Sequence, residues 1–246
     1  MEQIYSAPRG LNPGKHTFCP GCMHSTTVKT IARVLDNNGW LGKSIVCLSV
    51  GCGMQSAGYF EIDSIQSAHG RAAATAVGAK RMSPDNLIFT YQGDGAAAAI
   101  GLLETFYAAN RGEPITAIMV NNTIYGMTGG QTSPTTLLNQ KTVTTSPAGR
   151  LPTTEGYPVH MAELIASLEA PAYVARVSMH TPQQILKAEK VFEKAFRLQL
   201  EEKKYSFIEV VSACPTNWNI APKNGPKFIE EHVLPEFPLG ELKKPD

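Results

Sequence analysis

The stretch from Tyr91 to Gln131 constrains the fold more than any other part of the chain. A short β-rich apolar run, residues 86–91, leads directly into Gly93-Asp94-Gly95, a pattern typical of a strand that turns tightly into a helix. Over residues 96–110, apolar side chains recur at the spacing of one helical face, and alanines favour the helix. The stretch therefore predicts a strand, a glycine turn and a helix that begins beside Asp94.

A second strand completes this unit and brings another polar group to the same place. Residues 115–120 are a buried-strand run that ends in Asn121-Asn122. The carboxyl ends of parallel strands are where open α/β sheets bind ligands. There, glycines allow close approach of a ligand, a helix start attracts phosphate oxygens, and the oxygens of Asp94 and Asn122 suit Mg²⁺. Each motif alone is explained by turn composition, but together, across one helix and strand, they favour a site for a diphosphate and its metal.

Length and composition indicate one globular α/β domain. The 246 residues are 43% apolar, enough to bury a core over residues 1–246 as an open, mainly parallel sheet flanked by helices. Further strands are predicted at residues 44–50, 172–179 and 205–211. With 22 basic and 21 acidic residues the net charge is +1, which gives no reason to expect a nucleic-acid or membrane partner. No membrane span or signal peptide is expected, so the prediction is a cytoplasmic protein.

Three segments lack a clear period. Residues 1–17 are predicted to be an extended arm and residues 219–246 an extended tail, both lying on a partner subunit. Residues 132–159 form a long segment rich in Thr, Ser, Pro and Gly. A loop of this length in a compact domain is usually functional, so we expect it to cover the ligand or to dock on a partner.

The chain has five cysteines, and four of them lie in turns. Cys19 and Cys22 flank Pro-Gly, Cys52 follows the first strand, and Cys214 follows the last. Cys47 lies within an apolar strand and is interpreted as a small core residue. Disulfides are not expected in the cytosol. Four thiolates are the number that a [4Fe–4S] cluster needs and equally suit a zinc Cys₄ site, so the spacing leaves both open.

These motifs resemble those of a known family. GDG followed by NN resembles the thiamine diphosphate motif, and YGMTGGQTSPTT resembles the β subunits of 2-oxoacid:ferredoxin oxidoreductases. CPGC near the start, a VGCG turn and a late Cys-Pro are similar to the cluster ligands of these subunits. The resemblance covers about residues 18–218, and its overall likeness is to the branch acting on 2-oxoisovalerate or 2-oxoglutarate rather than pyruvate.

The resemblance implies roles for particular residues. The Asp94 and Asn122 side chains and the Ile124 carbonyl would bind Mg²⁺, and His69 would contact cofactor or substrate as a catalytic group. The residues implied to hold the cofactor are Gly51, Cys52, Gly53, His69, Gly93, Asp94, Gly95, Asn122, Ile124, Gly126, Met127, Thr128 and Gly129. The implied ligands of a [4Fe–4S] cluster are Cys19, Cys22, Cys52 and Cys214. Many relatives read GDGD, whereas Ala96 follows Gly95 here.

The implied reaction is oxidative decarboxylation of a 2-oxoacid with coenzyme A, giving an acyl-CoA and CO₂. Electrons would leave through the cluster to ferredoxin. Thiamine chemistry also needs an acid, usually Glu, to activate the aminopyrimidine. No residue here matches it, and the resemblance places it on an α subunit, with γ and δ subunits as further possible partners. We therefore expect the isolated chain to be inactive.

Two alternatives belong to other classes. One is a non-oxidative thiamine diphosphate-dependent decarboxylase or synthase component whose cysteines hold a structural zinc ion. The other is a zinc-stabilised regulatory or scaffold domain without cofactor, which the intact GDG and NN motifs disfavour. The substrate is less constrained, although an apolar Met127 beside the cofactor is compatible with an apolar side chain.

Overall fold

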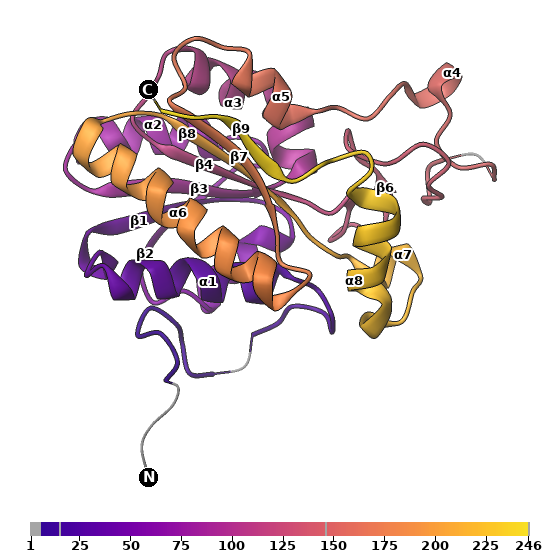
Figure 1. Cartoon of the computed structure of the whole chain (residues 1–246), viewed down its shortest axis with the longest axis horizontal. Helices are drawn as coiled ribbons and strands as arrows, with labels where there is room; N and C mark the ends of the chain where they lie inside the picture. Colours follow the sequence, from indigo (N-terminus) through magenta and orange to yellow (C-terminus); the bar gives the residue numbers. More distant parts are fainter. Residues whose placement is uncertain (1–5, 15, 146, 246) are drawn as a thin grey trace.

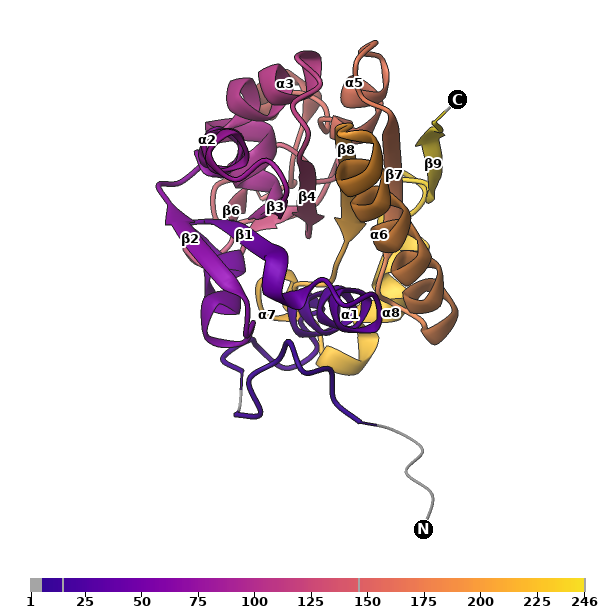
Figure 2. The ribbon, with the colours of Figure 1, turned by 90° about the vertical axis from the view of Figure 1, so that its left-hand side faces the viewer.

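The computed structural model describes residues 6–14, 16–145 and 147–245, and a sheet of seven strands forms its centre (Figures 1 and 2). In spatial order the strands are β2 (Asp63–Ser67), β1 (Ser44–Ser49), β3 (Leu87–Gly93), β4 (Thr116–Asn121), β8 (Ser206–Val211), β7 (Tyr173–Ser178) and β9 (Gly240–Lys243). Every neighbouring pair is parallel except β7 and β9. The mainly parallel sheet predicted from the sequence is confirmed.

The five strands expected from apolar runs are all present, as β1, β3, β4, β7 and β8. The structure adds β2 and β9 at the two edges of the sheet and a short hairpin of β5 (Ile124–Tyr125) with β6 (Gln131–Thr132). The edge strands read DSIQS and GELK. Because they carry few apolar residues, they give no signal of a buried strand.

Helices cover both faces of the sheet (Figure 2). On one face lie α1 (His24–Asn37) and α6 (Pro182–Glu202), and on the other lie α2 (Ala72–Met82), α3 (Leu102–Asn110) and α5 (Met161–Ala166). Thr181 caps α6 by accepting from the Gln184 N–H at 3.3 Å, and Pro182 occupies its first turn, as predicted. Within the described part of the chain, no helix is both long and apolar enough to span a membrane.

The helix expected over residues 96–110 is divided. A π-helical turn, η3 (Ala96–Ile100), precedes Gly101 and α3. At Gly101 the chain passes so close to the loop before α2 that a Cβ atom would lie 2.1 Å from the Gly70 carbonyl oxygen. The apolar side chains of this segment do share a face, but Leu103 is 65% and Tyr107 51% exposed. The buried face of α3 instead carries the small residues Thr105, Ala108 and Ala109, and α3 packs against α2 and α5.

The segment after Trp218 is not an extended tail. It forms η4 (Pro222–Asn224), α8 (Gly225–Phe228), η5 (Ile229–Val233) and β9, which pairs antiparallel with β7. Three apolar side chains anchor it in the main core: Ile229, Val233 and Phe237. These three residues are separated by charged residues and prolines, so they do not form an apolar run that the sequence would reveal.

The N-terminal arm lies along its own domain. Leu11 is buried and forms a bridge with Phe60, and the Arg9 guanidinium contacts the Asp36 carboxylate at 2.7 Å. Residues 1–5 and 15, which belong to the predicted arm, lie outside the described residues. The short elements that connect this side of the molecule are η1 (Leu41–Lys43) and η2 (Cys52–Gly58).

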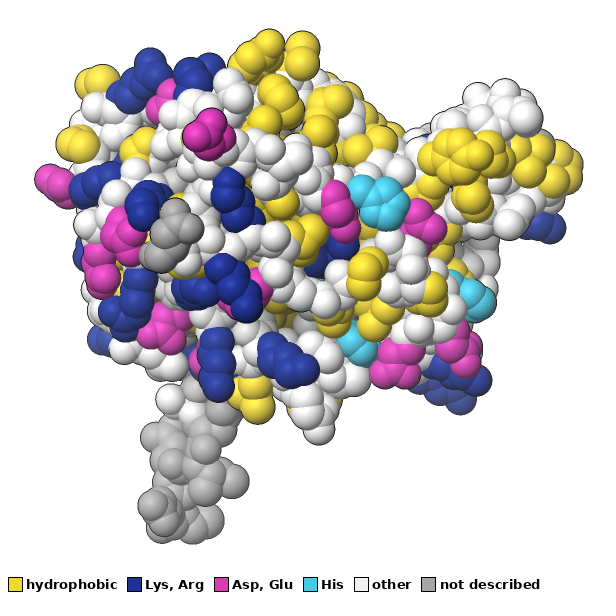
Figure 3. All heavy atoms as spheres, turned by 45° about the horizontal axis from the view of Figure 1, so that its top comes forward, with side chains coloured by type: hydrophobic (Ala, Val, Ile, Leu, Met, Phe, Trp, Pro, Cys, Tyr) yellow, Lys and Arg dark blue, Asp and Glu magenta, His cyan; other side chains and the backbone are white. Residues whose placement is uncertain are grey.

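The loop of residues 132–159 projects from the body and carries the one-turn helix α4 (Pro152–Glu155) (Figures 1 and 3). The projecting part exposes hydrophobic side chains (Figure 3). Val143 and Tyr157 are exposed residues of this loop. Arg150 is buried beneath it, and its guanidinium donates to six backbone carbonyls. These belong to Ser133, Pro134, Thr136, Glu155, Gly156 and Tyr157. Arg150 thus joins the two ends of the loop, residues 133–136 and 155–157, to each other.

The contact between Gly101 and Gly70 gives a stability prediction. Gly101→Ala should lower the free energy of unfolding by about 2 kcal/mol or more, because the added methyl group has no space against backbone. Gly78→Ala is the matched control, since Gly78 lies within α2 with no atom within 4 Å of a Cβ. That variant should be about 0.5–1 kcal/mol more stable. Urea denaturation measures both, and equal stabilities would contradict the proposed close packing.

Candidate functional site

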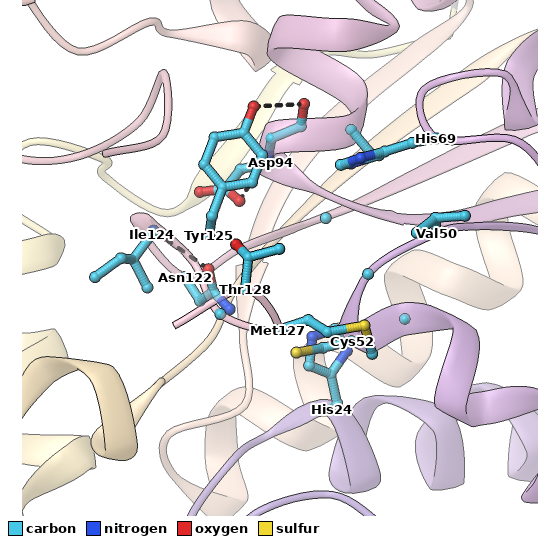
Figure 4. A pocket seen from close by; sticks show the side chains of 16 residues that line it. His24, Val50, Cys52, His69, Asp94, Asn122, Ile124, Tyr125, Met127 and Thr128 are labelled. Carbon is cyan, nitrogen blue, oxygen red and sulfur yellow. Dashed lines mark hydrogen bonds between the residues drawn. The ribbon is translucent and has the colours of Figure 1, made fainter. Parts of the chain in front are cut away.

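A pocket opens where β1, β3 and β4 end, at the edge where the sequence places its polar motifs (Figure 4). The cofactor residues implied by the resemblance all line it, apart from Gly129. Gly129 lines a neighbouring cavity instead. The residues of the pocket that the sequence reasoning did not select are His24, Val50, Ala96 and Tyr125.

Asp94 is a buried carboxylate that accepts hydrogen bonds from the loop of residues 132–159. Its Oδ1 accepts from the Gly95 N–H at 2.8 Å. Its Oδ2 accepts from the Ser133 hydroxyl at 2.8 Å and from the Thr135 hydroxyl at 2.5 Å. Burial raises the pKa of Asp94 to about 6, although these hydrogen bonds act in the opposite direction. The loop hydroxyls therefore fix the orientation of the carboxylate at the helix start.

The turn between β4 and β5 presents Asn122 to the same pocket. Asn122 Oδ1 lies 3.4 Å from the Ile124 N–H that donates to it, and the Trp218 indole donates to the Asn122 carbonyl at 3.1 Å. Tyr125 lies across the GDG turn and donates to the Gly95 carbonyl at 3.2 Å. A Cβ at Gly95 would lie 2.1 Å from that ring. This contact explains why the last position of the motif requires glycine.

Asp94 and the Asn122 turn together offer the oxygen atoms that a hard cation prefers. The first turn of η3 begins beside them, and Gly95 and Ala96 at its start line the pocket. An anion such as a diphosphate is stabilised at such a position, particularly with a cation between it and Asp94. The residues present fit a diphosphate bound through Mg²⁺.

His69 enters the pocket from the loop before α2, across from Asn122 (Figure 4). Its ring lies edge-on to Tyr125, with centroids 6.3 Å apart. Burial lowers the pKa of His69, so it is neutral at pH 7 and has one ring nitrogen that donates and one that accepts.

A second cavity lies directly behind the first. Cys19, Cys22, Cys52 and Cys214, the four cysteines expected to act together, all line it. Burial raises the pKa of Cys22 to about 12 and that of Cys52 to about 11. Cys47 is fully buried in β1, within the core on the other face of the sheet. Its interpretation as a core residue agrees with this position.

The two cavities share a wall. His24, Cys52, Asn122 and Gly126 line both of them. A Cβ at Gly126 would lie 3.3 Å from the Cys52 sulfur and 3.5 Å from the Cys214 sulfur, so the absence of a side chain there keeps the wall thin.

His24 is the aromatic member of that wall. Its Nδ1 lies 2.7 Å from the Tyr91 hydroxyl, and its ring stacks on Phe18 with centroids 5.4 Å apart. Burial lowers the pKa of His24 to about 4, so it adds no charge between the cavities at neutral pH.

Comparison with known proteins agrees with this geometry. The model of the thiamine pyrophosphate enzyme C-terminal TPP-binding domain matches residues 26–210. The ketoisovalerate oxidoreductase subunit VorA of Methanothermobacter thermautotrophicus is 41% identical over 243 residues, which cover 99% of this chain and 51% of that relative. The chain thus spans about half the length of this relative.

A shorter relative and a solved structure extend the comparison. The 2-oxoglutarate synthase subunit KorB of Archaeoglobus fulgidus is 34% identical over 215 residues, covering 87% of this chain and 76% of that relative. The fold also matches a 2-oxoglutarate:ferredoxin oxidoreductase from Magnetococcus marinus, solved with 2-oxoglutarate, coenzyme A and succinyl-CoA bound. The TM-score is 0.78 at 22% identity, over 99% of this chain and 86% of that one. The chain belongs to the thiamine pyrophosphate enzymes, among the TPP-binding subunits of 2-oxoacid:ferredoxin oxidoreductases.

The buried Asp94 gives a pH-dependent prediction for the chain free of metal and cofactor. Because the folded chain holds this proton more tightly than the unfolded chain, the free energy of unfolding should fall as pH rises from about 4 to about 6. The size of the loss is about 3 kcal/mol. Asp94→Asn removes it, so urea denaturation across this range in EDTA should show the wild type losing stability relative to the variant. Parallel pH profiles would contradict the buried titration.

Proposed function

We propose that this chain is the thiamine diphosphate-binding subunit of an enzyme that oxidatively decarboxylates a 2-oxoacid with coenzyme A and passes electrons to ferredoxin. One observation carries this proposal. A pocket with oxygen donors and a helix start shares a wall with a cavity lined by four cysteines. A decarboxylase without electron transfer has no use for that arrangement, whereas an oxidative one needs its electron exit beside the site of bond breaking.

In this proposal the Asp94 and Asn122 side chains and the Ile124 carbonyl hold Mg²⁺, and the first turn of η3 holds the diphosphate. When bound, thiamine diphosphate supplies the nucleophilic carbon and electron sink for decarboxylation, and a [4Fe–4S] cluster supplies a one-electron exit. This chain's own residues orient these groups. His69 offers a neutral hydrogen-bonding group to the pocket. His24 of the shared wall is packed in place by Phe18, on which its ring stacks.

The lining of the second cavity supports a cluster in this proposal. The cavity lined by Cys19, Cys22, Cys52 and Cys214 measures about 240 Å³, which is more than a single metal ion needs. Four thiolates around a space of this size suit a multi-atom cluster.

The pocket also bears on the substrate. Among the described residues that line it, none is Lys or Arg, and Met127 supplies a half-exposed apolar side chain. A second carboxylate, as in 2-oxoglutarate, would therefore have no Lys or Arg partner among the described residues that line this pocket. We therefore propose a substrate with an apolar side chain, 2-oxoisovalerate in particular, and the 41% identity to a ketoisovalerate oxidoreductase subunit supports this choice.

The site needs a partner subunit. Asp94 is the single carboxylate among the described residues that line the pocket, so the acid that activates the aminopyrimidine has to come from another chain or from a further domain. We propose that an α-type subunit supplies it and that γ or δ subunits and ferredoxin complete the electron path.

Metal analysis tests the second cavity. The chain, purified without oxygen, should contain about four iron and four sulfide per chain, and Cys214→Ser should lose most of both. Cys47→Ser is the matched control and should retain them, because Cys47 lies in the other core. Zinc in place of iron would instead favour the structural Cys₄ site of a non-oxidative enzyme.

Turnover tests the substrate and the partner. With its co-purified partner subunits, the enzyme should reduce a one-electron acceptor with 2-oxoisovalerate and coenzyme A. Its kcat/KM should exceed that for 2-oxoglutarate by about 10-fold or more, and the isolated chain should be inactive. A preference for 2-oxoglutarate, or turnover by the chain alone, would refute the respective part of the proposal.

A further inference from the structure

A buried charged pair lies behind the turn that carries Asn122, outside both cavities. Arg176 on β7 and Glu209 on β8 are directly paired in the register of the sheet, and their side chains are fully buried. The Arg176 Nε atom lies 2.9 Å from Glu209 Oε2. The remaining guanidinium nitrogens contact both oxygens of Glu163 on α5, at 2.8 and 2.5 Å.

The pair has a third member on the next strand. The buried Asn121 at the end of β4 donates from Nδ2 to Glu209 Oε1 at 2.7 Å. This bond uses the side of the carboxylate that Arg176 leaves open. Stability does not explain the arrangement, because replacing a buried ion pair by apolar side chains of similar volume is often neutral or stabilising. Arg176 also donates to the Pro238 carbonyl at 3.1 Å, whereas the contact that leads from the pair toward the cofactor pocket is the one to Asn121.

Asn121 holds a strained turn. Its Oδ1 accepts from the Thr123 N–H at 3.1 Å, and Thr123 has a φ of 60°. A β-branched residue adopts this left-handed conformation only at a cost in free energy, which the surroundings have to offset. The Thr123 carbonyl accepts from Thr136 at 2.6 Å, and its hydroxyl accepts from Gln140 at 2.9 Å. Every polar atom of the strained residue is thus bonded.

The strain has a geometric result. Asn122 precedes the left-handed residue and Ile124 follows it, and both line the cofactor pocket. The left-handed turn at Thr123 brings the Asn122 side chain and the Ile124 backbone together in the cofactor pocket. Strain that is fixed by its surroundings is typical of functional sites.

We propose that Glu209, fixed by Arg176, is a positioning residue that acts through Asn121 to keep the Thr123 turn left-handed and so sets the affinity for Mg²⁺ and thiamine diphosphate. Glu209 does not line the pocket, and its effect passes through one side chain and one backbone turn. The inference rests on the proposed function, since it assumes that the pocket binds these two ligands. The inference adds to that function a residue that determines cofactor affinity, Glu209, on strand β8, which contributes no group to the cofactor pocket.

The test is a set of binding measurements on the chain purified with its partner subunits. Asn121→Ala and Glu209→Leu should each weaken thiamine diphosphate binding at saturating Mg²⁺, measured calorimetrically, by about 10-fold, the usual scale for groups that orient metal ligands. Glu163→Gln is the matched control. It keeps a carbonyl oxygen for Arg176 and does not touch Asn121, so its affinity should stay within about twofold of the wild type.

A second arm separates positioning from general damage. Glycine adopts the left-handed conformation without strain. In the T123G background, Asn121→Ala should therefore weaken thiamine diphosphate binding by less than about threefold. Fluorescence of Trp218, whose indole donates to the Asn122 carbonyl, should report the change in the turn before ligand is added. Thermal unfolding identifies a variant that does not fold. If one of Asn121→Ala and Glu209→Leu fails in this way, the other is compared with the wild type.

The outcomes separate the two levels of the argument. Failure of the wild type to bind thiamine diphosphate with Mg²⁺ would overturn the proposed function. Wild-type binding together with unchanged affinity in Asn121→Ala and Glu209→Leu would overturn the positioning role alone. The positioning role would also be overturned if Asn121→Ala weakened thiamine diphosphate binding equally with and without T123G, because the effect would then not depend on the strained turn.

Discussion

The parallel pairing of β1, β3, β4 and β8 is the constraint on which the site depends. Parallel strands end at the same edge, so the segments that follow them meet there whatever their distance in the sequence. In this chain the convergence brings Cys52, the GDG turn, the Asn122 turn and Cys214 together. Two cavities with different chemistry then become neighbours because β1 and β8 lie on either side of the strands that supply the oxygen donors.

Buried charge at this edge is tolerated because distant segments bind it. Asp94 is held by hydroxyls of the projecting loop, and Glu209 is held by Arg176 and Asn121. An unpaired carboxylate in either place would be strongly destabilising. The polar partners therefore stabilise the fold and orient the donors of the site at the same time, which ties the geometry of the pocket to correct docking of the loop and of β7.

The sequence predicted the parts of this structure that depend on local pattern. The five inner strands are apolar runs, and GDG and NN are short motifs that mark strand ends. The edge strands β2 and β9 were missed because their side chains are polar, and the folded tail was missed because Ile229, Val233 and Phe237 are scattered. The partners of Asp94 and Asn121 are 39 and 88 residues away, and no periodicity in the sequence reports such pairs.

Arg150 bears on how this surface meets other molecules. A loop of this length usually samples many conformations, and ordering it on contact would cost about 1–2 kcal/mol of backbone entropy per residue. Here the Arg150 guanidinium is bonded to six carbonyls and already restricts the two ends of the segment, residues 133–136 and 155–157. Association through the exposed Tyr157, whose carbonyl accepts from Arg150, would consequently lose little backbone freedom. The affinity of such a contact would then be determined by the side chain itself rather than by the cost of ordering the backbone.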